Sequence, residues 1–349
     1  MSVSPVFVVG TPRSGTTLTA RILGRHPEFF MGGENHFFED IYARRSELGD
    51  PSTDRQARLR ISQRLLDIYG RYNQHEDQDR INQYFSAGSE NLERLNNCTS
   101  YRQFLDCFME TQAGAIRWGN NTPKDIFHVD AIREFYPDAI IVVCVRDLRD
   151  FLVSYGLRWT VTSEAHRERL RKLYHPVLTA LLWRSTALQL QRLQEVMPDS
   201  KLCLVRYEDL VQEPEATVQR LCATCGLDYS ADLLAVQADN SSLGHGGRGI
   251  FTRSVGSWRE RLPAADAWLA EKTAGSLLAR LGYERAAPWP GFVPLLRTLL
   301  MFPFAALRAL HANRAHRGPL LQYLRRRLTT PRPVSSADNR TKEGRAGAR

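Results

Sequence analysis

The feature that most constrains the fold of this chain is a glycine-bounded loop near its start. Residues 10–17 read Gly-Thr-Pro-Arg-Ser-Gly-Thr-Thr, directly after the apolar run Val6–Val9. A strand that enters such a loop and continues into a helix points several backbone N–H groups at one spot, which suits a phosphate group. The two glycines have the spacing of the nucleotide-binding P-loop, but Thr16 stands where that motif has its lysine. Because that lysine holds the outer phosphates of a nucleoside triphosphate and the cation here is Arg13, we expect the loop to bind an anion other than ATP.

Four apolar runs predict the strands of a parallel sheet: Val6–Val9, Phe29–Met31, Ala139–Val145 and Leu202–Val205. None of them alternates strictly between apolar and polar residues, and segments of helical period lie between them, which is typical of parallel strands buried on both faces. Helices are predicted over Thr16–Arg25, Ile126–Phe135, Leu148–Arg158, Val177–Val196, Pro214–Cys225 and Ala264–Leu281. The sequence therefore predicts an α/β chain with a central parallel sheet between two layers of helices.

The charge of the chain is concentrated in a tail. The net charge is +9, yet residues 286–349 alone hold 12 Arg or Lys and 2 Asp or Glu, so residues 1–285 are close to neutral. We interpret 1–285 as one domain, with a polar helical insertion at 39–117 in a usual place for substrate recognition, and 286–349 as a basic, partly apolar extension. A near-neutral domain argues against a nucleic-acid partner, which would require a basic stripe on the fold itself.

A second anion-binding pattern follows the third apolar run. Arg146 stands at the end of that run, at the edge where parallel sheets hold ligands, and Ser154 and Arg158 follow on one face of the next helix. An Arg fork matches the oxygens of a phosphate. Two further segments stand out, Leu204–Leu210 with its Tyr-Glu-Asp-Leu ending and Phe251–Arg259 with Gly-Ser-Trp-Arg.

Together these motifs resemble those of sulfotransferases that use 3′-phosphoadenosine 5′-phosphosulfate (PAPS), in the branch that contains tyrosylprotein sulfotransferases and many bacterial enzymes. The resemblance covers about residues 5–285. It implies a P-loop-like three-layer fold, PAPS as the sulfonate donor and no metal, since PAPS has no β,γ-phosphate pair for Mg²⁺ to bridge. The cofactor-binding residues that it implies are Arg13, Ser14, Gly15, Thr16, Thr17, Arg146, Ser154, Arg158, Tyr207, Arg253 and Ser254.

The resemblance also suggests the groups that carry the reaction. Glu34, after Gly32 and Gly33, matches the Glu base of this branch, and His36 is the rival base. Arg13 would offset charge on the leaving group. The family usually has a Lys before Thr-Pro, but this chain has Asn121 there, so Lys124 is the candidate replacement.

The sequence leaves several alternatives open. A degenerate P-loop kinase or NTPase, or a non-catalytic relative that keeps the nucleotide site, are the alternatives to a sulfotransferase. The acceptor is expected to be a small molecule, a glycan or a lipid-linked compound. The N-terminus has no secretory pattern, which favours the cytoplasm. Residues 290–330, apolar and then rich in Arg, suit attachment to an anionic membrane surface.

Overall fold

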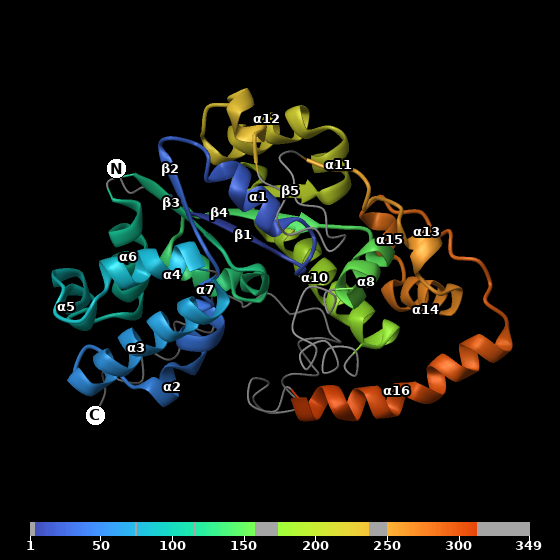
Figure 1. The fold of residues 1–349 in the computed structure, drawn as a ribbon, viewed down its shortest axis with the longest axis horizontal. Coiled ribbons are helices and arrows are strands. Elements are labelled where there is room, and N and C mark those ends of the chain that lie inside the picture. The colour runs from blue at the N-terminus through green and yellow to red at the C-terminus, as the bar shows by residue number, and fades with distance from the viewer. Residues whose placement is uncertain (1–3, 74, 115, 158–173, 237–249, 313–349) are drawn as a thin grey trace, which may run out of the picture.

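Five parallel strands form the centre of the computed structural model, which describes residues 4–73, 75–114, 116–157, 174–236 and 250–312 (Figure 1). The strand order is β2-β3-β1-β4-β5, and all neighbouring pairs are parallel. The strands are β1 (Val6–Gly10), β2 (Phe29–Gly32), β3 (Arg117–Asn121), β4 (Ile140–Val145) and β5 (Leu202–Arg206). Because every strand runs the same way, the loops that follow them meet at one edge of the sheet.

Helices cover both faces of this sheet. The described helices are α1 (Thr16–Leu23), α2 (Arg45–Leu48), α3 (Arg55–Tyr72), α4 (His75–Tyr84), α5 (Glu90–Asn96), α6 (Tyr101–Ala113), α7 (Val129–Phe135), α8 (Leu148–Leu157), α10 (Pro176–Val196), α11 (Tyr207–Gln212), α12 (Pro214–Cys225), α13 (Trp258–Arg261), α14 (Ala264–Ala274), α15 (Leu277–Arg280) and α16 (Phe292–Ala312). Phe7 and Val9 point into one apolar core with α3, α6, α7 and α10, whereas Val6 and Val8 point into a second core with α1 and α12. This alternation along a strand that is buried on both sides produces the three layers.

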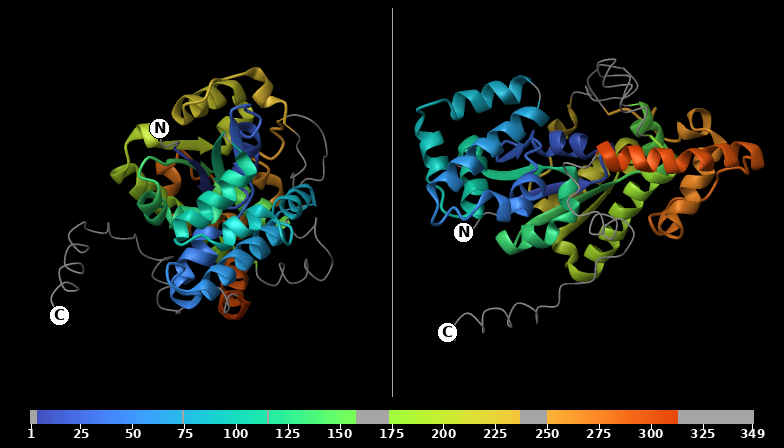
Figure 2. Two further views of the ribbon diagram at one scale, coloured as in Figure 1. Left: turned by 90° about the vertical axis from the view of Figure 1, so that its left-hand side faces the viewer. Right: turned by 90° about the horizontal axis from the view of Figure 1, so that it is seen from below.

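The two ends of the molecule are formed by different segments of the chain. Helices α2–α6 gather at one end of the molecule and α13–α15 at the other, and α16 runs from that second end back toward the middle (Figure 1 and the right-hand view of Figure 2). Helices α8, α10, α14 and α15 share a third apolar cluster that includes Trp183 and Phe151. The three-layer α/β fold expected from the sequence is confirmed.

The structure corrects three details of the sequence-based prediction. Strand β3 was not predicted, because its residues Arg-Trp-Gly-Asn-Asn form no apolar run. The strand starts at Arg117, so the insertion predicted over 39–117 ends at residue 116. The helix predicted over Ala264–Leu281 is interrupted at Gly275, whose φ is +63°. The helix predicted from Ile126 begins at Val129, after a 3-10 turn over Pro123–Phe127.

Candidate functional site

The loop between β1 and α1 turns tightly at the carboxyl end of the central strand. The amide of Ser14 donates to the carbonyl of Thr11 at 3.2 Å, and Gly15 has a φ of 88° at the start of α1. Arg13 has a positive φ of 72°, a conformation that costs a non-glycine residue about 1–3 kcal/mol and that is concentrated at functional sites. The hydroxyl oxygen of Ser14 is fully buried and has no hydrogen-bond partner within the described residues. A buried hydroxyl beside the open N–H groups of a first helical turn fits an anion that accepts from both.

Arg146 brings a second cation to this turn from the end of β4, the strand next to β1. Its Nη1 donates to the carbonyl of Arg13 at 3.4 Å, and its Nη2 donates to the carbonyl of Ser254 at 2.8 Å. Its Nε is buried and makes no hydrogen bond to the described part of the chain. Ser154, on α8, accepts from Nε of Arg13 at 3.3 Å. Two guanidinium groups and a serine that are far apart in the sequence therefore meet at one point.

Tyr207 closes the group from the end of β5. Its hydroxyl lies 2.7 Å from Oγ of Ser254, and the guanidinium of Arg146 lies 4.4 Å from the centre of its ring. The same ring packs on the loop so closely that a Cβ at Gly15 would lie 2.8 Å from a ring carbon, which explains why glycine stands there. We refer to these converging residues as the donor cluster, because each of their side chains can donate a hydrogen bond: Arg13, Arg146, Ser154, Tyr207 and Ser254.

The other residues predicted to bind the cofactor have different positions. Thr16 is buried and Thr17 half-buried in the first turn of α1. Arg253 is exposed beside Ser254. Arg158 lies outside the described residues, so its position remains a prediction.

Glu34 follows β2 and is held through its backbone. Its amide donates to Oδ1 of Asn73 at 3.0 Å, and Nδ2 of Asn73 donates to the Glu34 carbonyl at 2.9 Å. A Cβ at Gly33 would lie 1.9 Å from that Asn73 oxygen, so this close approach requires glycine. The Glu34 side chain is 32% exposed, which leaves its carboxylate open to a small molecule.

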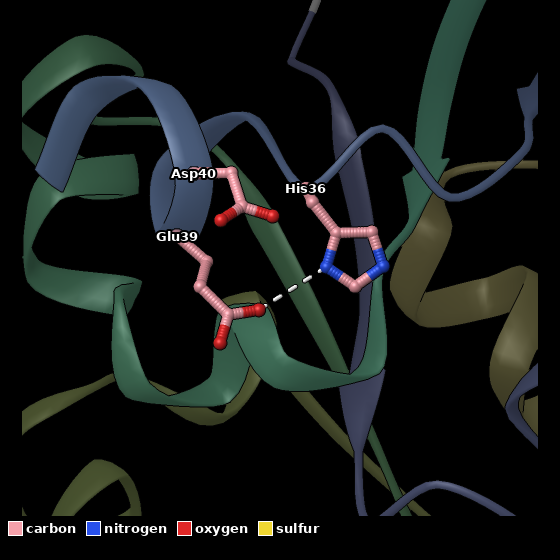
Figure 3. Close-up of side chains that lie close together, drawn as sticks. All are labelled: His36, Glu39 and Asp40. Atoms are coloured by element: carbon pink, nitrogen blue, oxygen red, sulfur yellow. Dashed lines mark hydrogen bonds and ion pairs between the residues drawn. The ribbon is translucent and has the colours of Figure 1, made fainter. Parts of the chain in front are cut away.

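His36 links Glu34 to a second carboxylate. Its Nε2 lies 3.0 Å from Glu34 Oε2 and its Nδ1 lies 3.2 Å from Glu39 Oε2 (Figure 3 shows the Glu39 contact). Burial alone would lower the pKa of His36, but the hydrogen bonds and charges of the two carboxylates outweigh it and raise that pKa to about 9. His36 is therefore an imidazolium at neutral pH, with both ring N–H groups engaged.

Lys124 extends this chain of charges. Its Nζ lies 3.0 and 3.1 Å from the two carboxylate oxygens of Glu39. Burial would raise the pKa of Glu39, but the hydrogen bond from His36 and the charge of Lys124 lower it to about 2. We call Glu34, His36, Glu39 and Lys124 the acid–base network. Asn121, at the end of β3, is buried and its Oδ1 has no hydrogen-bond partner in the described ranges, so an acceptor oxygen without a donor stands where the resemblance implies a cation.

His36, Glu39 and Asp40 lie close enough to suggest a metal site, since their ligand atoms fall within 4.8 Å of one another (Figure 3). Both ring nitrogens of His36 are already bound to carboxylates, and the Lys124 ammonium already occupies both oxygens of Glu39. A metal ion would have to displace the proton of His36 and the Lys124 ammonium before it could bind here. The group is better described as an ion-pair network than as a metal centre.

Two contributors to the site were not predicted from the sequence. Asp150, on α8, accepts from the amides of Gly256 and Trp258 at 2.6 and 2.9 Å and so fastens the loop that carries Ser254. Its position four residues after Arg146 is the sequence feature that could have pointed to this role. Asn73 had no such signal, because it ends a helix of the insertion 39 residues away from Glu34.

The chain is similar to several known proteins. A family model described as the sulfotransferase family matches residues 5–231. Nodulation protein NoeE of Sinorhizobium fredii is 25% identical over 302 residues, which cover 80% of this chain and 66% of NoeE. A protein of Aquifex aeolicus is 22% identical over 281 residues, covering 73% of this chain and 30% of that protein. The chain thus spans less than two thirds of the length of each of these relatives.

Two solved structures share the fold. The sulfotransferase domain of the Synechococcus PCC 7002 olefin synthase has a TM-score of 0.52 and 20% identity, covering 81% of this chain and 96% of that domain. The sulfotransferase domain from the curacin biosynthetic pathway has a TM-score of 0.52 and 15% identity, covering 81% of this chain and 99% of that domain.

Proposed function

The chain belongs to the sulfotransferase family, and from this premise we propose that it transfers a sulfonate group from PAPS to a hydroxyl or amine of its acceptor. The donor cluster is the observation that supports PAPS most strongly. It joins the β1–α1 turn to the ends of β4 and β5. Two buried donors, Nε of Arg146 in the cluster and Oγ of Ser14 beside it, have no protein partner in the described residues. A ligand with two separated anionic groups would satisfy both.

The two anionic groups of PAPS have separate candidates. Residues 13–17 would hold the 5′-phosphosulfate, because the turn and the first turn of α1 offer N–H groups and the Ser14 hydroxyl. Arg146 and Ser154 would hold the 3′-phosphate, and Tyr207 would lie near the adenine nucleotide. Bound PAPS supplies the sulfonate on a phosphate leaving group; the chain supplies the cations that offset its charge.

Glu34 is the proposed base. It must take the proton of the acceptor as the new bond to sulfur forms. Its carboxylate is partly exposed and bonds to Nε2 of His36, while Asn73 holds its backbone. His36 is a poor base here, since it is buried, protonated at neutral pH and bonded through both nitrogens.

Arg13 is the proposed stabiliser of the leaving group, because it lies in the turn that would hold the 5′-phosphosulfate. Groups of this kind typically contribute about 10²–10³-fold to the rate. Lys124 bonds to Glu39, so we propose that it acts through Glu39 and His36 on Glu34 rather than on the leaving group. It would then be a positioning residue.

The acceptor is proposed to be a small molecule, a glycan or a lipid-linked compound, shaped by helices α2–α6. Asn73, which caps the end of α3, holds the backbone of the proposed base Glu34, so this group of helices lies beside the place where the acceptor would react. The near-neutral charge of residues 1–285 argues against nucleic acid as the acceptor.

Sulfonate transfer itself is tested with ³⁵S-labelled PAPS, a lysate of the producing organism as the source of acceptors, and the purified chain. We expect label in a product with the native chain and a loss of about 10²–10³-fold with Arg13→Ala. Arg280→Ala, on the exposed surface of α15, is the matched arginine control and should retain activity. If no label is transferred although adenosine 3′,5′-bisphosphate binds, the chain is the non-catalytic relative. The replacement of the expected lysine by Asn121 would then be the proposed cause of the lost activity.

A further inference from the structure

Helix α16 is apolar around most of its circumference, yet among the described residues only one side of it is covered by the domain. Phe292 is 80% exposed, Leu307 66% and Leu300 62%. The exposed apolar side chains, here called the outer face of α16, are Phe292, Val293, Leu296, Leu299, Leu300, Met301, Phe304 and Leu307. Soluble proteins rarely leave a contiguous apolar surface of this kind uncovered, and such surfaces mark interaction sites.

The opposite side of α16 is fastened to the domain. His175 caps α10, because its Nδ1 accepts a hydrogen bond from the amide of Val177. The ring proton therefore lies on Nε2, which donates to the carbonyl of Thr298 at 3.0 Å. The His175 ring also packs against Phe302, and Ala305 is 1% exposed. Thr298, Phe302 and Ala305 recur at helical spacing, so they form one inner stripe that faces the domain.

The exposed side of α16 also carries positive charge. Arg297 and Arg308 are both exposed and lie about three turns apart on one edge of the outer face. The sequence that follows, residues 313–349, contains ten Arg or Lys and two Asp or Glu. Trp289 precedes the helix, is half exposed and contacts the ring of Phe292 at 5.3 Å between centroids. Tryptophan and arginine beside an apolar helix face suit the headgroup region of a bilayer.

We propose that α16 lies in the surface of an anionic membrane, with its outer face among the lipids and its inner stripe on the domain. This goes beyond sulfonate transfer and assigns the protein a lipid partner. Phosphatidylglycerol has a negatively charged headgroup that complements the positive charges of Arg297 and Arg308, since each basic residue near an anionic surface strengthens binding.

A helix that crosses the membrane fits these observations less well. Residues Phe292–His311 have the length and composition of a span. A span would expose the inner stripe to lipid and break the His175 contact. Pro303 has no N–H and leaves the Leu299 carbonyl without its helical partner, which costs free energy in hydrocarbon and little at a wet interface.

A second copy of the chain is the other occupant to consider. Pairing two outer faces would bring Arg297 and Arg308 of one helix close to the same arginines of the other. This like-charge contact opposes self-association, whereas an anionic surface neutralises the same charges. The charge pattern therefore favours lipid over a dimer.

Flotation of the full-length chain with vesicles tests the proposal. The vesicles are phosphatidylcholine alone or phosphatidylcholine with phosphatidylglycerol, at low and high salt. The chain should float with the anionic vesicles at least tenfold better than with the neutral ones, and high salt should release it. Leu300→Glu with Leu307→Glu should reduce flotation at least tenfold. The matched control, Ile116→Glu with Val196→Glu, places two glutamates at exposed apolar positions elsewhere and should float normally.

Other outcomes would overturn the proposal. Equal flotation of the Leu300/Leu307 variant would show that the outer face is not the contact. Retention at high salt and in alkaline carbonate would indicate a membrane span. A native dimer that the same variant converts to a monomer, with no flotation of either, would identify a second copy as the partner. Circular dichroism of each variant distinguishes these results from unfolding.

Discussion

The donor cluster and the acid–base network lie at the same edge of the sheet but balance their charges in opposite ways. In the donor cluster, Arg146 makes its hydrogen bonds to two backbone carbonyls and keeps a buried Nε without a partner in the described residues. In the network, His36 and Lys124 each lie within 3.2 Å of a carboxylate oxygen. The first region is therefore arranged to receive charge from a ligand, and the second is already neutralised and arranged to hold a carboxylate in place.

The largest expected effect would separate the two regions. Glu34→Gln removes the proposed base while keeping the shape and the hydrogen bonds of its backbone to Asn73. Turnover should fall about 10²–10⁴-fold, with the affinity for adenosine 3′,5′-bisphosphate nearly unchanged. Steady-state kinetics and calorimetry of the same preparation measure both. If His36→Ala is inactive and Glu34→Gln is active, His36 is the base and the division of roles is wrong.

The second prediction addresses the donor cluster. A buried, charge-assisted hydrogen bond contributes about 1.5–3 kcal/mol, so Arg146→Ala should weaken binding of adenosine 3′,5′-bisphosphate at least tenfold. Binding of adenosine 5′-monophosphate, which lacks the 3′-phosphate, should be spared. An equal loss for the two ligands would show that Arg146 supports the loop and does not bind the 3′-phosphate.

A smaller effect is expected from Lys124→Ala. Loss of this cation would leave Glu39 with His36 alone, and Glu34 would be held less firmly. We expect a turnover several-fold below that of the native chain and unchanged affinity for adenosine 3′,5′-bisphosphate. A loss as large as that from Arg13→Ala would instead mean that Lys124 touches the leaving group, as the lysine missing at Asn121 does in the family.

The smallest effect concerns stability and pH. The pKa of His36 is about 9 in the folded chain against an ordinary 6.5, so the folded state holds this proton more tightly. The resulting stabilisation is complete below about pH 6.5 and is lost as the pH rises through 9. The melting temperature of the native chain minus that of His36→Gln should therefore shrink between these pH values. A difference that is constant over this range would contradict the assigned protonation of His36.

The sequence predicted the donor cluster far better than the network. Arg13, Arg146 and Tyr207 each follow an apolar run, and parallel strands bring their carboxyl ends to one edge, so a list of strand ends predicts their meeting. Arg253 was chosen from the motif at Phe251–Arg259, and Arg158 from the helix that follows Arg146. The structure leaves the first exposed and does not describe the second.

The network depends on contacts that no local pattern encodes. Asn73 reaches Glu34 from the end of α3, and Lys124 reaches Glu39 from a 3-10 turn after β3. Strand β3 itself escaped prediction, because Asn120 and Asn121 are buried as polar residues, with Asn120 bonded to Asn35 and Asp125. Buried polar pairs of this kind are defined by tertiary packing, and periodicity cannot indicate them.

Calorimetric titration of the native chain with adenosine 3′,5′-bisphosphate, beside ATP without Mg²⁺, tests the central claim most directly. Both ligands carry adenine and several phosphates, but only the first has a phosphate at the 3′ position that Arg146 and Ser154 are proposed to hold. The account predicts saturable binding of adenosine 3′,5′-bisphosphate at least tenfold tighter than that of ATP. Equal or tighter binding of ATP would contradict it and favour a degenerate P-loop kinase or NTPase.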